Sequence, residues 1–174
     1  MRARPTSWPG VYHGIGLAAH ACSHGAGGNP STGQVIINTD GTVQVISAMN
    51  DIGPGERTLL MMLAAESLGV PITSVTTTPY VDTDVTTDTS GTFGSQQTNN
   101  GGRGAYEAAQ DARRQVLDWS VRKFLADAAA KKPPETLRLT VNDVDMQEGY
   151  VFQKSDPAKR LKLADVMAFR GKPL

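Results

Sequence analysis

The sequence predicts an α/β fold of the α+β kind: a mixed β-sheet that contains a β-hairpin, with two principal helices packed on it. Two β-branched runs, residues 34–38 and 42–49, flank Asp40-Gly41, a dipeptide that supplies the backbone angles of a tight hairpin. Residues 56–68 and 102–130 instead place apolar side chains at helical spacing. These patterns together predict the fold class.

The first part of the chain leads into the hairpin and then into the first helix. Residues 11–23 are rich in glycine and alanine and are predicted to be extended and half-buried, and residues 24–33 have the composition of a loop. After the hairpin, residues 51–55 break the second strand. Glu56 then stands in the first turn of the helix, where its charge favours the helix dipole, and Gly69 provides a left-handed stop.

The rest of the chain combines short elements with one long helix. The expected elements are a strand over residues 73–80, a threonine-rich loop over 81–100, the helix over 102–130, strands over 137–141 and 150–153, and a short helix over 161–169. Asn99 or Asn100 is expected to cap the long helix, and Pro133-Pro134 to end it. A loop as long as residues 81–100 is uncommon inside a compact domain, and it is usually functional when ordered.

Composition limits the class of protein. The 174 residues, 39% of them hydrophobic and 20% charged, match one domain, taken as residues 1–174. Lys plus Arg number 17, as do Asp plus Glu, which gives no electrostatic support for binding nucleic acid or an anionic membrane. The longest apolar stretch, residues 59–65, is too short to span a bilayer, and residues 1–10 lack the apolar run of a signal peptide. The expected location is therefore the cytoplasm.

Cys22 is the only cysteine, so the chain alone cannot form an internal disulfide or hold an iron–sulfur cluster. Electrons from any redox reaction would have to leave through another chain. His20, Cys22 and His24 alternate and would share one face of a strand, where a soft metal ion could bind them. A structural site usually needs a fourth ligand and none is obvious. Two histidines beside a small buried thiol are the favoured interpretation, and no metal ligand is assigned.

Two other chemical patterns find little support. The segment His13–Ala19 contains G-x-G-x-x-A, but glycines and a loop follow it, instead of the helix that dinucleotide binding requires. The chain has no G-x-S-x-G elbow, and Asp82, Asp84 and Asp88 are too numerous in one polar run to single out a base. No residue is therefore assigned a catalytic role.

Two glycine-bearing loops are the remaining candidates for a site. Gly53-Pro54-Gly55 follows a strand and opens a helix, where free backbone amides can meet an anion or a heterocycle. Residues 91–98 precede the long helix and carry side chains that both donate and accept hydrogen bonds. The alternative is that the glycines serve only the turns. The residues alone predict two amide-rich loops that could converge on one polar ligand.

A series of short motifs runs in a specific order through residues 14–116. The motifs are Gly14-Ile-Gly-Leu-Ala18, Thr39-Asp-Gly-Thr-Val-Gln-Val45, Asp51-Ile-Gly-Pro-Gly-Glu-Arg-Thr58, Ala64-Ala-Glu-Ser-Leu-Gly-Val-Pro71, Asp82-Thr-Asp84, Gly91-Thr-Phe-Gly-Ser-Gln-Gln-Thr98 and Gly104-Ala-Tyr-Glu-Ala-Ala109. In order and spacing they resemble the xanthine dehydrogenase and aldehyde oxidase family of molybdenum hydroxylases. The large subunit of carbon monoxide dehydrogenase is similar to this family pattern, and so is 4-hydroxybenzoyl-CoA reductase.

The resemblance implies a cofactor site. In that family the first loop reads Gly-Gln-Gly and, with the later Gly-Ser-rich segment, holds the pterin and the oxo or sulfido group of molybdenum. Carried over, Gly53 and Gly55 would contact the cofactor through their backbone. Its other side would be lined by Gly94, Ser95, Gln96, Gln97 and Thr98. The implied cofactor is molybdopterin, usually the cytosine dinucleotide form in bacterial members, shared here with partner chains.

The sequence departs from the family pattern at two points. Pro54 stands where the family has glutamine, so an amide donor is missing, and Gln96 or Gln97 is the expected replacement. The family's catalytic base is a glutamate in a glycine-rich motif much further downstream, and Glu135 and Glu148 have no such context.

The resemblance therefore implies a part of a larger assembly. The expected partners are the remaining part of the molybdenum subunit, an iron–sulfur subunit and an FAD subunit, and the substrate would be a small molecule. Expressed alone, the chain is expected to self-associate through the apolar surface that its partner would cover. The alternative is a non-catalytic binding or scaffold subunit whose cofactor site has degenerated.

Overall fold

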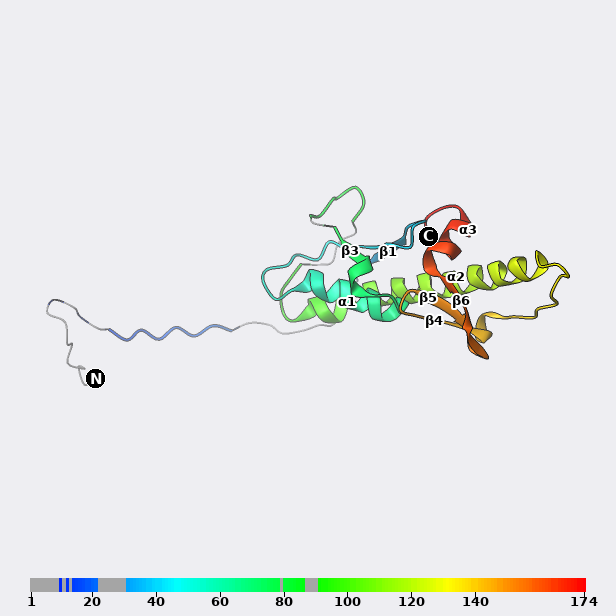
Figure 1. Ribbon diagram of the computed structural model, residues 1–174. Helices are drawn as coiled ribbons and strands as arrows, with labels where there is room; N and C mark the ends of the chain where they lie inside the picture. Colours follow the sequence, from blue (N-terminus) through cyan, green and yellow to red (C-terminus); the bar gives the residue numbers. More distant parts are fainter. Residues whose placement is uncertain (1–9, 11, 13, 22–30, 79, 87–90) are drawn as a thin grey trace.

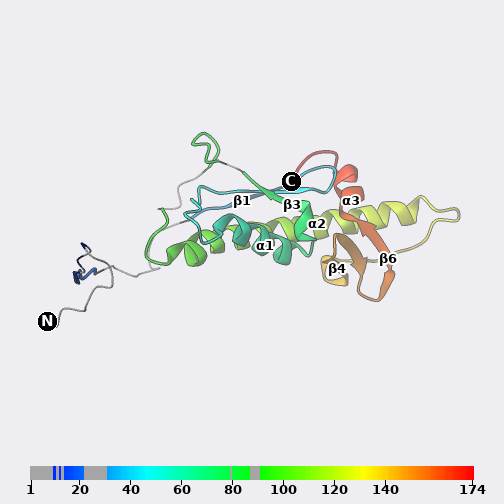
Figure 2. The same cartoon turned by 60° about the vertical axis from the view of Figure 1, so that its left-hand side comes forward.

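The structure is a computed structural model that describes residues 10, 12, 14–21, 31–78, 80–86 and 91–174. Its long helix, α2 (Gly102–Ala129), runs along the folded part of the molecule (Figure 1). In both views, α1 (Glu56–Leu68) and the first sheet lie beside the N-terminal half of α2 (Figures 1 and 2). The second sheet and α3 (Leu163–Arg170) lie beside its C-terminal half. The predicted α/β class is thus confirmed, as are the two principal helices.

The first sheet contains the predicted hairpin. Its strands are β1 (Gln34–Ile37), β2 (Val43–Ile46) and β3 (Val75–Thr77), in that spatial order. β1 and β2 are antiparallel and β2 and β3 are parallel, so the sheet is mixed, as predicted. In the hairpin turn, Asp40 Oδ1 accepts hydrogen bonds from Thr42 N at 2.9 Å and Thr42 Oγ1 at 2.7 Å. β3 is shorter than the strand predicted over residues 73–80, because a 3₁₀ turn, η1 (Ile72–Ser74), comes before it.

Helix α1 ends where the sequence predicts. Gly69 adopts the left-handed conformation, with φ of 71°, and its N–H donates to the carbonyl oxygens of Ala65 and Glu66. These bonds satisfy carbonyl groups that the last turn of a helix leaves free. The chain then turns at Pro71 towards β3, so α1 joins β2 to a parallel neighbour.

The structure contains a second sheet, whereas the sequence predicted only one. It consists of the antiparallel strands β4 (Val144–Gln147), β5 (Tyr150–Gln153) and β6 (Asp156–Lys162). The strand predicted over residues 150–153 is confirmed. The strand predicted over residues 137–141 is wrong: no strand forms there, and a 3₁₀ turn, η3, occupies Val141–Asp143.

The alternating pattern that suggested the wrong strand has a physical cause. Leu137 and Leu139 pack against the core from a segment that itself forms no strand. β6 was missed for the opposite reason, since most of its side chains are polar and exposed. The last helix was predicted over residues 161–169, and it begins at Leu163 because β6 extends to Lys162.

Two further expectations are corrected near the long helix and at the start of the chain. Asn99 and Asn100 cap no helix, because both lie inside a π-helical turn, η2 (Gln97–Gly101), that runs directly into α2. The described residues 14–21 form no strand or helix, and all of them are exposed instead of half-buried.

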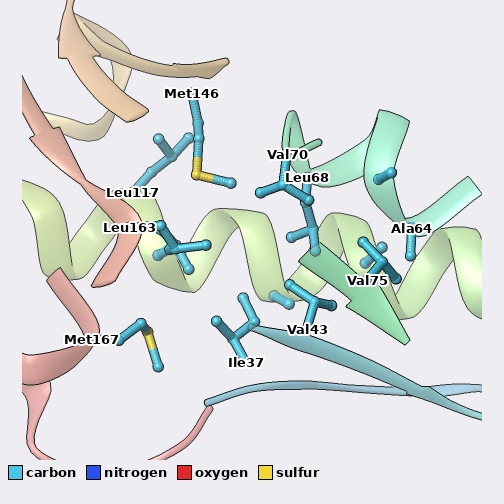
Figure 3. Close-up of a cluster of buried hydrophobic side chains, with 14 of the residues drawn as sticks. Ile37, Val43, Ala64, Leu68, Val70, Val75, Leu117, Met146, Leu163 and Met167 are labelled. Atoms are coloured by element: carbon cyan, nitrogen blue, oxygen red, sulfur yellow. The ribbon is translucent and has the colours of Figure 1, made fainter. Parts of the chain in front are cut away.

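One apolar core joins the helices to both sheets. Figure 3 shows Ile37 and Val43 of the first sheet facing Leu68 of α1, with Leu163 and Met167 close by. Small side chains on α2 let these elements approach closely. The fully or almost fully buried positions of that stripe are Ala105, Ala109, Ala112 and Val116, as the helical spacing predicted.

Candidate functional site

The loop after β2 is held in shape by one carboxylate. Asp51 Oδ1 accepts hydrogen bonds from Gly53 N at 2.9 Å and Gly55 N at 3.1 Å. Gly53 and Gly55 have φ of 122° and 93°, a region that glycine favours. A Cβ added at either position would meet nothing within 4 Å, so the backbone angle, and not crowding, requires glycine. The N–H donors on both sides of Pro54 are therefore already in use.

These hydrogen bonds have an electrostatic consequence. The amides of Gly53 and then Gly55, which both donate to the carboxylate, hold the pKa of Asp51 below its ordinary value. The charged form of Asp51 is thus the form that fits the loop.

Removing the Asp51 carboxylate should release the loop. In Asp51→Ala, hydrogen exchange at the Gly53 and Gly55 amides is expected to accelerate, and Asp51→Asn, which keeps a side-chain oxygen, should retain much of the protection. Because the folded pKa is lowered, the loop is fully held above the ordinary aspartate pKa and loosens only as pH falls through the lowered value. Amide shifts of Gly53 and Gly55 followed by NMR during an acid titration measure this. Exchange in Asp51→Ala equal to wild type would contradict the assignment.

The second loop approaches α2 through a strained turn. Gly94 and Ser95 both have positive φ, 58° and 59°, and the N–H of Gln96 donates to Phe93 O at 3.2 Å. Serine in this region is uncommon and costs conformational energy. The π-helical turn η2 follows at once, and such turns occur often at functional sites.

Two buried glutamines tie this loop together. Gln96 is 1% exposed and Gln97 is 5% exposed. Gln96 Nε2 donates to Gly91 O at 3.1 Å, and Gln97 Nε2 donates to Thr92 Oγ1 at 2.8 Å. Thr92 Oγ1 in turn donates to Asn50 O at 2.7 Å, which connects the second loop to the residues before the first. Both side-chain amides thus donate a hydrogen bond within the loop. Each amide nitrogen carries a second N–H, so replacement of the donor that Pro54 lacks by Gln96 or Gln97 stays a prediction.

The two loops converge on one cavity of about 460 Å³. Ile52, Pro54 and Glu56 line it on one side. The other side consists of Thr92, Phe93, Gly94, Ser95, Gln96, Gln97 and Thr98. The structure thus brings the predicted residues Gly94 to Thr98 opposite Pro54, while Gly53 and Gly55 shape the loop on either side of that proline.

Glu56 is the site residue that sequence reasoning missed. The sequence identifies it only as a favourable charge in the first turn of α1, yet its side chain is 6% exposed and lines the cavity. Within the described part of the chain, Glu56 Oε2 is buried with no hydrogen-bond partner, and so is Gln97 Oε1. An acid directly after a glycine loop was the available signal. The cavity that it lines is completed by the second loop, which lies far away in sequence.

The other sequence motifs contribute nothing here. His13, Cys22 and His24 lie outside the described residues, so the possible soft-metal face cannot be located. Among the residues that the structure does describe, no group of three His, Cys, Asp or Glu side chains could hold a metal ion. Within that same part of the chain, no helix is both long and apolar enough to cross a membrane.

Comparison with known families identifies the type of domain. Residues 2–173 match the model of the molybdopterin cofactor-binding domain. The chain belongs to this family. It is a molybdopterin cofactor-binding domain of the molybdenum hydroxylase type, as its motifs predicted.

Two relatives show how much of a complete subunit this domain represents. The xanthine dehydrogenase molybdenum-binding subunit of Escherichia coli O157:H7 is 33% identical over 108 residues, which cover 62% of this chain and 13% of that protein. The nicotine 6-hydroxylase large subunit of Paenarthrobacter nicotinovorans is 28% identical over 135 residues, which cover 78% of this chain and 15% of that protein. The matched part of the chain thus spans only 13% and 15% of these relatives.

Solved structures share the fold. Quinoline 2-oxidoreductase from Pseudomonas putida 86 superposes with a TM-score of 0.63 at 24% identity, covering 80% of this chain and 16% of that one. Carbon monoxide dehydrogenase from Oligotropha carboxidovorans gives a TM-score of 0.65 at 18% identity, covering 79% and 15%. At these identities, the likeness establishes the fold alone.

Proposed function

We propose that the domain contributes two loops to the molybdopterin site of a molybdenum hydroxylase-type oxidoreductase. The supporting observation is the convergence of the Pro54 loop and the Gly94–Thr98 segment on one cavity of about 460 Å³. That volume lies within the usual range of small-molecule sites. Two buried polar atoms in its wall, Glu56 Oε2 and Gln97 Oε1, have no hydrogen-bond partner among the described residues, which fits a ligand that forms hydrogen bonds.

The residues of this domain would bind and orient the cofactor. Molybdopterin supplies the redox chemistry, in which a C–H bond is hydroxylated with oxygen from water or a related substrate is reduced. Gly94 leaves the second loop without a side chain at that position, and the hydrogen bond from Thr92 to Asn50 holds that loop against the residues before the first loop. Asp51 fixes the backbone around Pro54. Phe93 and Ile52, 60% and 71% exposed, would limit access of water once the rest of the site is assembled.

The remainder of the enzyme would come from other polypeptide segments. The proposed cofactor is the cytosine dinucleotide form of molybdopterin, and the catalytic glutamate, the iron–sulfur clusters and the FAD would lie outside these 174 residues. Two relatives are named as a molybdenum-binding subunit and a large subunit, which supports a role inside a multi-subunit assembly. The proposed location of that assembly is the cytoplasm. Exposed apolar side chains, among them Ile15 and Leu17, support self-association when the partners are missing.

A valine at Gly94 should prevent cofactor retention. Its side chain would enter the cavity wall that the second loop forms, so an assembly carrying Gly94→Val is expected to lose most of its molybdenum when co-purified with its partners. Metal analysis per mole of protein measures this. Gly171→Val is the matched control, because Gly171 also has positive φ but caps α3 away from the cavity. Equal molybdenum in wild type and Gly94→Val would remove Gly94 from the site.

The second candidate is a non-catalytic scaffold subunit with a degenerate site. Two observations favour it: Pro54 has no N–H, and Asp51 already engages the amides of Gly53 and Gly55. This loop would then offer a cofactor few donors. The same metal analysis separates the candidates, since stoichiometric molybdenum in the wild-type assembly supports the enzyme and its absence supports the scaffold.

A further inference from the structure

A second cavity, of about 490 Å³, lies where the C-terminal end of α1, helix α2 and β4 meet. It shares no lining residue with the cavity between the two loops. Three carboxylates, Glu66, Asp145 and Glu148, are among the described residues that line it, together with one guanidinium, that of Arg113. With all four groups ionised at neutral pH, the wall carries an excess of negative charge.

The positive charge in this wall is already balanced. Arg113 Nη2 donates to the Asp145 carboxylate, so these two side chains form an ion pair. Glu66 and Glu148 form no ion pair with any residue in the described part of the chain. Two unpaired carboxylates beside a neutral pair create a negative potential in the cavity, which favours a cation.

A buried hydroxyl in the same wall lacks a partner. Ser67 is 6% exposed and lines the cavity, and its hydroxyl forms no hydrogen bond with another of the described residues. The buried Ser120 on α2 differs, because its hydroxyl donates to Leu117 O at 2.7 Å, a usual arrangement for a helical serine. Burying a polar group without a hydrogen bond costs free energy, so we expect the Ser67 hydroxyl to bind a group that enters the cavity.

Two further features of the wall favour a planar organic cation. Phe152 is half-buried and lines the cavity, where it offers an aromatic ring on which a guanidinium can stack. Glu148 has φ of 50° in the turn between β4 and β5, a conformation that costs a glutamate more energy than a glycine. Within the part of the chain that is described, no group of three His, Cys, Asp or Glu side chains could hold a metal ion. The carboxylates therefore fit an organic cation better than a metal ion.

We propose that this second cavity receives the guanidinium group of an arginine side chain from another polypeptide segment. Glu66 and Glu148 balance its charge, the Ser67 hydroxyl accepts one of its N–H groups, and Phe152 covers one face. A guanidinium carries five N–H donors in a rigid plane, so it can reach acceptors on both α1 and the β4–β5 turn, whereas the ammonium of lysine is a compact point charge. The inference goes beyond the proposed function and requires only that more polypeptide accompanies this domain, as it does in the relatives, of which the matched part covers 13% and 15%.

Titration of the full chain with three blocked tripeptides tests the proposal. The peptides carry arginine, lysine or citrulline between two glycines, and citrulline is the neutral analogue of arginine with nearly the same shape. The NMR shifts of the Ser67 and Gly149 backbone amides follow binding. The arginine peptide is expected to bind about fivefold more tightly than either of the others, because only its side chain combines the charge with a planar set of N–H donors.

A pair of double variants assigns the binding to this wall. Glu66→Gln combined with Glu148→Gln should weaken binding of the arginine peptide by about fivefold, because two charged acceptors become neutral. Glu107→Gln combined with Asp118→Asn is the matched control, since it removes two exposed carboxylates of α2 that do not line the cavity. The control should leave binding unchanged, and far-ultraviolet circular dichroism reports that both double variants keep the fold.

Three results would each overturn the inference. They are binding of the lysine or citrulline peptide as tight as that of the arginine peptide, no shift of the Ser67 and Gly149 amides, and unchanged binding when Glu66 and Glu148 are both replaced. None of these results bears on the proposed function, because this cavity shares no residue with the two loops and the molybdenum analysis tests those loops separately.

Discussion

Gly69→Ala is expected to lower the free energy of unfolding by about 3 kcal/mol, from left-handed strain of about 1 kcal/mol or more plus overpacking of about 2 kcal/mol. Gly69 caps α1 with φ of 71°. An added Cβ would overlap the carbonyl oxygen of Met146 and lie 3.1 Å from Arg113 Nη1. The obstacle is backbone of β4, which cannot move aside without disturbing the second sheet.

A second glycine separates the two contributions. Gly171 also caps a helix in the left-handed conformation, with φ of 79°, but a Cβ there would meet nothing within 4 Å. Gly171→Ala should therefore lower the free energy of unfolding only through left-handed backbone strain, by about 1 kcal/mol. Urea denaturation of both variants measures the difference. If the two alanines destabilise the protein equally, the close approach of α1 to β4 is not what constrains position 69.

Arg113→Met is expected to lower the free energy of unfolding by about 2 kcal/mol, because it leaves several buried acceptors without their donor. Arg113 lies on α2 and is 20% exposed. Its Nη1 donates to Leu68 O at 2.9 Å, and its Nη2 donates to Met146 O at 3.1 Å and to the Asp145 carboxylate. One guanidinium thus joins the C-terminus of α1 to the second sheet, and methionine would keep only the apolar stem.

The neighbouring arginine provides the control. Arg114 is 69% exposed and pairs with Asp111 on the same helix at 2.8 Å. Exposed pairs of this kind contribute little, so Arg114→Met should change the free energy of unfolding by about 0.5 kcal/mol or less. Both variants are measured by urea denaturation under the same conditions. Similar losses in the two would show that Arg113 acts as an ordinary surface charge and does not join the elements.

The parts of the fold that sequence predicts well are those that local chemistry determines. Asp40-Gly41 forms its hairpin with hydrogen bonds inside the turn itself, and Gly69 followed by Pro71 ends α1 for reasons of backbone geometry. The second sheet depends instead on distant packing. Leu137 and Leu139 have the alternation of a strand but face the core from an irregular segment, while β6 pairs despite its exposed, charged residues.

The same distinction between local and distant causes applies to the candidate site. Its glycines and polar segment, Gly53, Gly55 and Gly94 to Thr98, are visible in the sequence as loops at helix starts. What these groups do in the fold depends on partners that no local pattern specifies. Asp51 accepts hydrogen bonds from the amides that a ligand was expected to use, and Glu56 is buried in the wall of a cavity that the distant second loop also lines.

The π-helical turn between the second loop and α2 also determines the direction in which that loop leaves the helix, measured around the axis of α2. A π-turn holds one residue more than an α-helical turn, and each residue of an α-helix advances the chain by about 100° around the axis. Losing a single residue from Gln97–Gly101 would restore an ordinary helical turn and leave α2 and its alanine stripe in place. Everything before the turn would rotate, and Gln96 and Gln97 would swing away from Pro54. Chain length at this point therefore matters as well as residue identity, because an insertion or deletion here would displace the second loop while the core continues to fold.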